Sequence, residues 1–317
     1  DSLPNATYVG FTGTPIDATL DVFGALVDSY TMNESVKDDI TVRIVYEGRA
    51  AKVLLDNSKL KEVEDYYQQC QQDGANEYQI EDSKKAMASM GAILGDPDRI
   101  KAIASDFVAH YEQRIAEGST VAGKAMFVSS SRPIAYQLYQ QIKALRPEWF
   151  EVLDCAEGEE LTDKERKALT PSARVRMVMT RHKDDDKALW DLLGTKDDRK
   201  ALDRQFKQAK SNFKIAIVVD VPFIDTMYID KPVSQHNLIQ TISRVNRKYK
   251  GKSKGLVVDY IGIKTSMNKA LKQFGGSGAD NFEDIAASIV EVRNHLDLLN
   301  KAFYHFDSSD YFSGDPI

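Results

Sequence analysis

The sequence has few residues of the kinds that cross-link a chain or bind metals. Its two cysteines, Cys70 and Cys155, share no metal-ligand spacing and are too few for a disulfide framework, which favours a reducing cytoplasm. The five histidines form no pattern typical of a metal site. No apolar run reaches the roughly 18 residues of a membrane span, so neither a bound metal nor a membrane is expected.

Motifs of ATP-hydrolysing and DNA-cutting proteins are also missing. The sequence contains no Gly-x-x-x-x-Gly-Lys-Ser/Thr loop, whose backbone N–H groups hold nucleotide phosphates, and no Asp-Glu-x-His box. No carboxylate and lysine cluster typical of a nuclease is recognisable. This chain alone is therefore expected to bind ATP weakly or not at all and to leave DNA uncut. It begins with Asp1 close to an apolar run, and we expect it to be a piece of a longer protein.

The charge balance argues against one class of protein. A formal net charge of −6 and a pI of about 5.5 do not fit a globally basic nucleic-acid binder. A local basic patch is nevertheless present between residues 244 and 254. Its cations are Arg244, Arg247, Lys248, Lys250, Lys252 and Lys254. The length of 317 residues suits about two domains.

Residues 1–16 are expected to end one domain. An apolar run at Ala6–Phe11 predicts a buried strand, and Thr12, Gly13 and Thr14 follow it directly. Small polar residues after a strand often line a phosphate-binding or interdomain crevice in α/β proteins. They also suit a simple polar turn, because glycine marks turns of many kinds.

Residues 17–122 are expected to hold linker strands and a helical insertion. Alternating β-branched residues predict one or two strands within Thr41–Leu55. Helical patterns follow at Lys59–Gln72 and at Glu81–Gly118, where apolar residues recur every three or four positions. No site chemistry is recognisable in this insertion.

Residues 123–274 alternate between strand-like and helix-like patterns. The predicted strands are Lys124–Val128, Phe150–Asp154, Arg174–Met179, Ile215–Asp220, Thr226–Asp230 and Gly255–Tyr260. The predicted helices are Ile134–Leu145, Lys187–Leu193, Asp198–Phe206 and Gln235–Arg247. Such alternation predicts an α/β domain with a parallel sheet flanked by helices. Residues 275–317 are predicted to form a helical C-terminal region, with an amphipathic helix at Asn281–Phe306.

Polar residues follow two of these predicted strands. Ser129, Ser130 and Arg132 come after Lys124–Val128, and Thr180 comes after Arg174–Met179. Ligands of open parallel sheets bind at the carboxyl ends of the strands. These positions are therefore candidates for ligand contacts.

One connection is too short for a parallel sheet. Asp220 ends a predicted strand and Thr226 begins the next, whereas a direct parallel connection needs about a dozen residues. Either the two strands are antiparallel or kinked together, or residues are missing from the sequence between Asp220 and Val221.

The spacing of Gln240, Arg244 and Arg247 predicts one face of a helix, because positions three and four apart are neighbours on a helix surface. One interpretation is a solvated basic helix end, where cations suit the negative end of the dipole. The other is a phosphate sensor, since a planar guanidinium fork matches phosphate oxygens. The spacing alone does not separate the two.

Taken together, these blocks resemble the second RecA-like motor domain of a superfamily 2 helicase, and more closely the motor (R) subunit of type I restriction enzymes. The matching blocks are Gly10–Ile16, Gly123–Val128 with Ser131 and Arg132, Phe213–Asp220, Asp225–Pro232, His236–Arg247 and Gly255–Ile263. The last three blocks are specific to this family rather than to helicases at large. The resemblance is weakest at residues 59–118 and after Phe274.

The resemblance implies that Gln240, Arg244 and Arg247 are motif VI. In the family these arginines reach the γ-phosphate of an ATP, with its Mg²⁺, that is bound mainly by the preceding motor domain. Arg244 and Arg247 would then be catalytic, and Gln240 would help to bind the nucleotide. This implication favours the interpretation of Gln240, Arg244 and Arg247 as a phosphate sensor over that of a solvated helix end.

The resemblance also implies a coupling element and a DNA path. Thr12, Gly13 and Thr14 would be motif III, which links the nucleotide state to the DNA. The implied contacts to the DNA backbone are Ser130, Arg132 and Thr180. The implied partners are double-stranded DNA and the methyltransferase and specificity subunits of an ATP-dependent type I deoxyribonuclease. Two alternatives stay open: a motor domain of another repair or remodelling helicase, and a RecA-like binding module without catalysis.

The sequence departs from the family pattern at motif V. A Thr-Gly-Phe-Asp segment normally lies between the strand ending at Asp220 and Pro222, and here it is absent. Either a loop has been omitted between Asp220 and Val221, or motif V is truly deleted and the motor is crippled.

Overall fold

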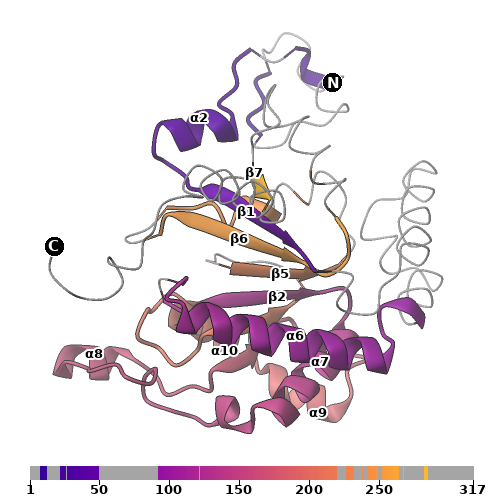
Figure 1. Ribbon diagram of the computed structural model, residues 1–317, viewed down its shortest axis with the longest axis vertical. Helices are drawn as coiled ribbons and strands as arrows, with labels where there is room; N and C mark the ends of the chain where they lie inside the picture. Colours follow the sequence, from indigo (N-terminus) through magenta and orange to yellow (C-terminus); the bar gives the residue numbers. More distant parts are fainter. Residues whose placement is uncertain are drawn as a thin grey trace, which may run out of the picture.

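In the part of the chain that the computed structural model describes, seven strands form one sheet in the order β3-β4-β2-β5-β6-β1-β7 (Figure 1). The described residues are 8–12, 22–25, 27–49, 92–120, 122–219, 226–231, 238, 241–248, 252–263, 267 and 282–284. The strands are β1 (Arg43–Gly48), β2 (Ala125–Ser129), β3 (Val175–Met177), β4 (Ile215–Val218), β5 (Thr226–Asp230), β6 (Lys254–Asp259) and β7 (Phe282–Asp284). All neighbouring strands pair in parallel, which confirms the predicted α/β class.

The sequences of the central strands are continuous apolar runs because both faces of the sheet are covered there. Every residue of β2, β4 and β5 is buried. Parallel sheets require helices on their faces, so their strands lack the alternation of half-exposed strands. This is why the predicted strands at these three places are confirmed within one or two residues.

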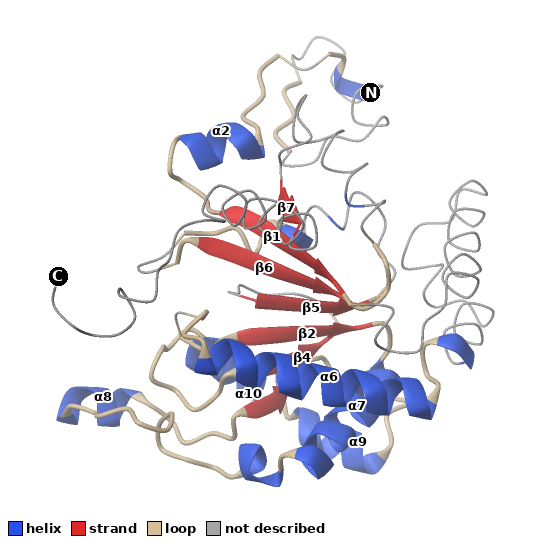
Figure 2. Ribbon diagram, viewed as in Figure 1, coloured by secondary structure: helices blue, strands red, loops and turns tan. Residues whose placement is uncertain are grey.

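Two long helices lie side by side across one face of the sheet (Figure 2). They are α6 (Pro97–Ala116) and α7 (Arg132–Leu145). Each begins at a side-chain cap: the Asp96 carboxylate accepts from the Arg99 N–H and the Ser131 hydroxyl accepts from the Ile134 N–H. The other helical segments are α2 (Met32–Lys37), η2 (Pro147–Phe150), α8 (Asp163–Ala168), α9 (Lys187–Leu193) and α10 (Lys196–Phe206). None of the described helices is both long and apolar enough to cross a membrane.

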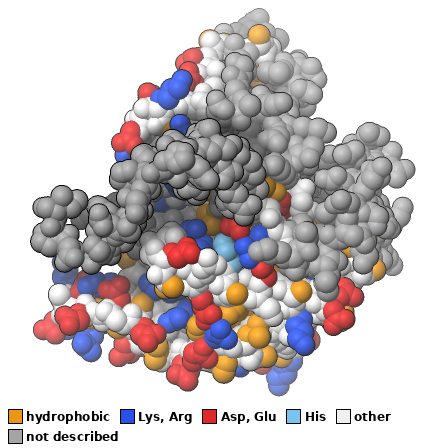
Figure 3. Space-filling view, viewed as in Figure 1, with side chains coloured by type: hydrophobic (Ala, Val, Ile, Leu, Met, Phe, Trp, Pro, Cys, Tyr) orange, Lys and Arg blue, Asp and Glu red, His pale blue; other side chains and the backbone are white. Residues whose placement is uncertain are grey.

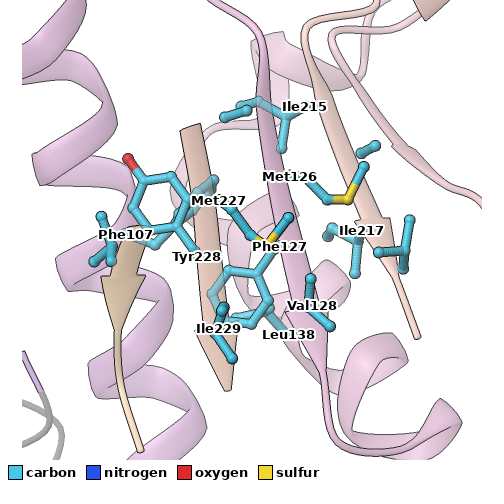
Figure 4. Close-up of a cluster of buried hydrophobic side chains, with 14 of the residues drawn as sticks. Phe107, Met126, Phe127, Val128, Leu138, Ile215, Ile217, Met227, Tyr228 and Ile229 are labelled. Carbon is cyan, nitrogen blue, oxygen red and sulfur yellow. The ribbon is translucent and has the colours of Figure 1, made fainter. Parts of the chain in front are cut away.

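The core joins α6 to the middle of the sheet (Figure 4). The Phe107 ring of α6 meets the rings of Phe127 and Tyr228 edge-on, with centroids 5.6 and 4.7 Å apart. Phe127 also stacks on Tyr260 at 5.9 Å. Helix α6 and strand β1 lie in the range predicted as linker and insertion, yet they share the sheet and core of the predicted motor domain. The boundaries at residues 16, 122 and 274 remain predictions.

The strand predicted at Ala6–Phe11 is wrong for residues 8–11, which have no regular secondary structure. Tyr8 and Val9 are exposed, and Phe11 is 94% exposed. A β-prone apolar run becomes a strand only where a neighbouring strand pairs with it. The strand predicted at Phe150–Asp154 is also wrong. There, η2 buries Trp149 against Tyr111, and only a single bridge joins Leu153 to Ser172.

Two helix predictions also change. The long helix predicted over Glu81–Gly118 is interrupted: residues 92–93 are helical, residues 94–96 are not, and α6 begins at Pro97, where Asp96 caps it and proline suits the first turn. Residues 81–91 lie outside the described part of the chain. Residues 282–284, predicted as part of a helix, form β7 and pair in parallel with β1. Pairing with an edge strand overrides the local amphipathic pattern there. The helix predicted at Lys59–Gln72 lies outside the described residues.

The short connection before Thr226 does not join antiparallel strands. Strands β4 and β5 pair in parallel with the two sides of β2, so they run in the same direction. The antiparallel alternative is therefore wrong. Residues 220–225 lie outside the described part of the chain, and the omission or deletion at Asp220–Val221 stays a prediction.

Candidate functional site

The arginine segment, defined as residues 241–248, is a turn rather than a continuous helix. Helical residues end at Ile242. The Arg244 N–H then donates to the Thr241 carbonyl at 3.3 Å, and the Val245 N–H donates to the Ile242 carbonyl at 2.9 Å. These i to i−3 hydrogen bonds tighten the chain. The prediction of a helix continuing to Arg247 is wrong over residues 243–247.

Burial explains this turn. Ile242 and Val245 are fully buried and Asn246 is nearly so. Because the chain turns to bury these side chains, Arg247 is exposed and Arg244 is half-buried. Arg244 and Arg247 therefore do not lie on one helical face. Gln240 lies outside the described residues, and its place beside them stays a prediction.

The arginine segment is attached to the amino end of β1. The Val42 N–H donates to the Asn246 carbonyl at 2.7 Å. Arg247 forms an antiparallel bridge with Thr41, and Lys248 makes an ion pair with Asp39. The sequence reasoning missed this attachment, since about 200 residues separate the two segments.

The candidate DNA contacts lie at the opposite edge of the sheet, where β2 and β3 end. Ser129 and Ser130 are buried, and within the described residues their hydroxyl oxygens have no hydrogen-bond partner. Ser131 caps α7, so its hydroxyl is already used by the helix. Thr180 is exposed just after β3. Ser130 and Thr180 thus lie just beyond the carboxyl ends of β2 and β3, which β4 separates in the sheet, and their contacts to DNA stay a prediction.

Arg132 holds the backbone beside Thr180. Its Nε donates to Asp185 Oδ1 at 2.9 Å, and its Nη1 donates to the Thr180 carbonyl at 2.6 Å. Asp185 also accepts from the His182 N–H at 2.7 Å. Burial raises the pKa of Asp185, but the hydrogen bonds from Arg132 and from the His182 N–H, together with the charges of both residues, outweigh it, so the pKa is lowered overall. The guanidinium is thereby engaged within the protein.

The predicted site residues therefore form two separate groups. Arg244 and Arg247 lie near the amino ends of β1 and β6, and the Ser130 and Thr180 group lies at the carboxyl ends of β2 and β3. Thr12 is exposed in the coil before β1. Gly13 and Thr14 lie outside the described residues. No group of three potential metal ligands occurs in the described ranges.

A buried polar network between α6 and the sheet was not predicted. Arg49 makes an ion pair with Asp106 of α6 at 2.6 Å, and the Tyr260 hydroxyl donates to the same carboxylate at 2.8 Å. His110 lies between the Tyr228 hydroxyl, 2.9 Å away, and Glu47, 3.1 Å away. Burial raises the pKa of Glu47, but hydrogen bonds and charges of His110 and Arg49 bring it down to about 2.

Asp259 plays a structural part at the end of β6. The Tyr46 hydroxyl donates to its Oδ2 at 2.6 Å, while its Oδ1 accepts from the N–H groups of Ile261 and Gly262. Burial raises the pKa of Asp259, and these hydrogen bonds oppose that effect. The carboxyl group thus closes the turn after β6.

Family models match two parts of the chain. Residues 1–79 match the model described as SWI2/SNF2 ATPase, and residues 121–262 match the model described as type I restriction enzyme subunit R domain 3. The second match contains β2 to β6 and includes Arg132, Thr180, Arg244 and Arg247.

Two relatives of this chain belong to the same family of proteins. The HindI endonuclease subunit of a type I restriction enzyme from Haemophilus influenzae is 33% identical over 96% of this chain. A protein named as the MjaIXP endonuclease subunit of such an enzyme, from Methanocaldococcus jannaschii, is 29% identical over 98% of this chain. The chain spans 28% of the length of each relative. A solved fragment described as an HsdR subunit from Vibrio vulnificus YJ016 is 13% identical, with a TM-score of 0.48 over 85% of this chain and 41% of that chain. The chain belongs to the family of type I restriction enzyme R subunits and corresponds to a part of their length that includes subunit R domain 3.

Proposed function

We propose that this chain supplies the arginine half of an ATPase site and part of a duplex DNA track to the ATP-dependent translocating subunit of a type I restriction system. The observation that carries the proposal is the arginine segment. Exposed Arg247 and half-buried Arg244 stand on a turn that buried side chains and β1 hold in place. A turn fixed in this way can present guanidinium groups to a ligand bound by another part of the protein.

The chemistry suits phosphoryl transfer. Positioning and charge stabilisation dominate this reaction, and an arginine finger contributes about 10³- to 10⁵-fold in rate. ATP and Mg²⁺ would be held mainly by the preceding motor domain, with Gln240 assisting on this side. Thr12, Gly13 and Thr14 would couple the nucleotide state to the DNA.

The DNA track would use the carboxyl edge of the sheet. A translocating motor must ignore base sequence, so its contacts should go to phosphates. Exposed Thr180 offers a hydroxyl donor there, and Arg132 fixes the backbone of Thr180. The visible face carries acidic and basic side chains interspersed (Figure 3), which fits a few local contacts better than a broad basic surface. The methyltransferase and specificity subunits would be partners of the whole protein.

The test uses the full-length protein. Arg247→Ala is expected to lower DNA-stimulated ATP hydrolysis by about 10³-fold or more, while DNA affinity changes little. Lys248→Ala is the matched control, because it removes an adjacent exposed cation that is paired with Asp39. Unchanged ATP hydrolysis in Arg247→Ala would refute the assignment. The 317-residue chain alone is expected to hydrolyse no ATP.

A further inference from the structure

We propose that Lys252 and Gly255 are positioning residues for Arg244 and Arg247. They act by holding the carbonyl of Val245, which lies between the two arginines in sequence. The proposal rests on the proposed function. It adds two contacts that fix the positions of the guanidinium groups.

The first contact is a buried lysine. Lys252 is 5% exposed, and its Nζ donates a hydrogen bond to the Val245 carbonyl. Burying an ammonium group costs free energy unless the group is hydrogen-bonded, and the hydrogen bond to the Val245 carbonyl offsets part of that cost. A hydrogen bond from a charged donor is also stronger than one between neutral groups. It fixes the carbonyl in the middle of the arginine segment.

The second contact is a close approach that only glycine permits. A Cβ atom at Gly255 would lie 2.2 Å from the Val245 carbonyl oxygen and 2.7 Å from its Cγ1. Gly255 is the second residue of β6, and every residue of this strand from Gly255 to Asp259 is buried. Because β6 is held inside the sheet and cannot move away, a side chain at position 255 would push the arginine segment outward. Gly255 therefore sets how closely that segment packs on the sheet.

The two contacts act on both arginines through one short stretch of backbone. The next residue, Asn246, accepts the hydrogen bond from Val42, and Arg247 pairs with Thr41 directly after it. Val245 is thus held from the β6 side and Asn246 from the β1 side. A misplacement of about 1 Å in a catalytic constellation can cost about a hundredfold in rate. Loss of either β6 contact should consequently lower kcat without removing any group that touches ATP.

The experiment measures DNA-stimulated ATP hydrolysis in the full-length protein. Lys252→Met and Gly255→Ala are each expected to lower kcat by about ten- to a hundredfold, with little change in KM for ATP. Lys101→Met is the matched control, because this exposed lysine lies on α6, away from the basic patch. In an Arg247→Lys background, which keeps measurable activity, the same two variants should have a much smaller effect. Such non-additivity is the signature of residues that act through Arg247.

A second measurement separates positioning from the chemistry. Hydrogen exchange of the Val42 amide, which donates to Asn246, should accelerate in Lys252→Met and in Gly255→Ala but not in Lys101→Met. Slow exchange together with unchanged kcat in both variants would overturn the proposal, as would losses of kcat that multiply with Arg247→Lys. If Val42 exchange accelerates while Arg247→Ala leaves ATP hydrolysis intact, the Val245 contacts stand and the proposed function fails. Gly255→Ala keeps the proposal testable if Lys252→Met does not fold.

Discussion

Arg99 of α6 and Asp230 of β5 form an ion pair in which both side chains are 1% exposed. Arg99 Nη2 lies 2.5 Å from Asp230 Oδ1, although 131 residues separate the two positions. The guanidinium also donates to the carbonyls of Leu94 and Tyr260. Burial raises the pKa of Asp230, and the charge of Arg99 opposes that effect. The pair therefore ties α6 to the ends of two central strands.

Removing one member of this pair should be strongly destabilising. Arg99→Met is expected to lower the free energy of unfolding by about 3–5 kcal/mol, because it leaves a buried carboxyl group without its partner. Replacing both, with Arg99→Met and Asp230→Leu, should recover most of the loss. Urea unfolding of the 317-residue chain measures the free energy of unfolding of the single and the double variant. Lys207→Met, which breaks the half-exposed pair with Asp203, is the control and should cost at most about 0.5 kcal/mol.

The Glu47 carboxylate should make the free energy of unfolding depend on pH in the acid range. Its pKa is about 2 in the folded chain against an ordinary 4.5, so the folded state favours the charged form. The resulting stabilisation is complete above pH 4.5 and disappears as the pH falls towards 2. The difference in free energy of unfolding between the wild type and Glu47→Gln should therefore shrink as the pH falls from 4.5 towards 2. A difference between Glu47→Gln and the wild type that stays the same throughout this window would contradict the prediction.

Lys124 should make the free energy of unfolding depend on pH in the neutral to alkaline range. Burial, helped by the charge of Lys214, lowers the pKa of Lys124 from 10.5 to about 7. The unfolded chain therefore binds the extra proton between these values, and stability should rise with pH across that range. Lys124→Met is expected to be more stable than the wild type at pH 7, with an advantage that fades near pH 10.5. The hydrogen bond from Lys124 Nζ to the Phe213 carbonyl, 2.5 Å long, reduces that advantage. Unfolding curves at the two pH values give the comparison.

DNA affinity as a function of salt should reveal how Arg132 acts. A cation that contacts a phosphate contributes about 0.9 to the slope of log affinity against log salt. Since the guanidinium is engaged by Asp185 and the Thr180 carbonyl, Arg132→Ala should weaken binding in the full-length protein without changing that slope. Asp185→Asn should weaken it similarly, and Thr180→Ala should weaken it more than Thr180→Ser. A slope reduced by about one unit in Arg132→Ala would instead indicate a direct phosphate contact.

Local patterns predicted the secondary structure well where strands are short, apolar and covered on both faces. Strands β2, β4 and β5 follow from apolar runs, and helix α7 matches the helical pattern predicted at Ile134–Leu145. The family was also readable, because its motifs are contiguous stretches of sequence. The candidate site residues came from the same motifs, and the roles of Arg244, Arg247 and Thr180 remain proposals.

The amino-acid sequence by itself determined the alternation of strands and helices, the polar residues at two strand ends and the position of the arginines along the chain. Only the tertiary structure decided that Arg244 and Arg247 leave the helix, that β1 and α6 complete the core, and that Arg99 meets Asp230. The physical reason is the distance along the chain. Hydrophobic periodicity and caps act within a few residues, whereas burial of Val245 against Gly255 and pairing of Thr41 with Arg247 depend on contacts that form only when the sheet has assembled.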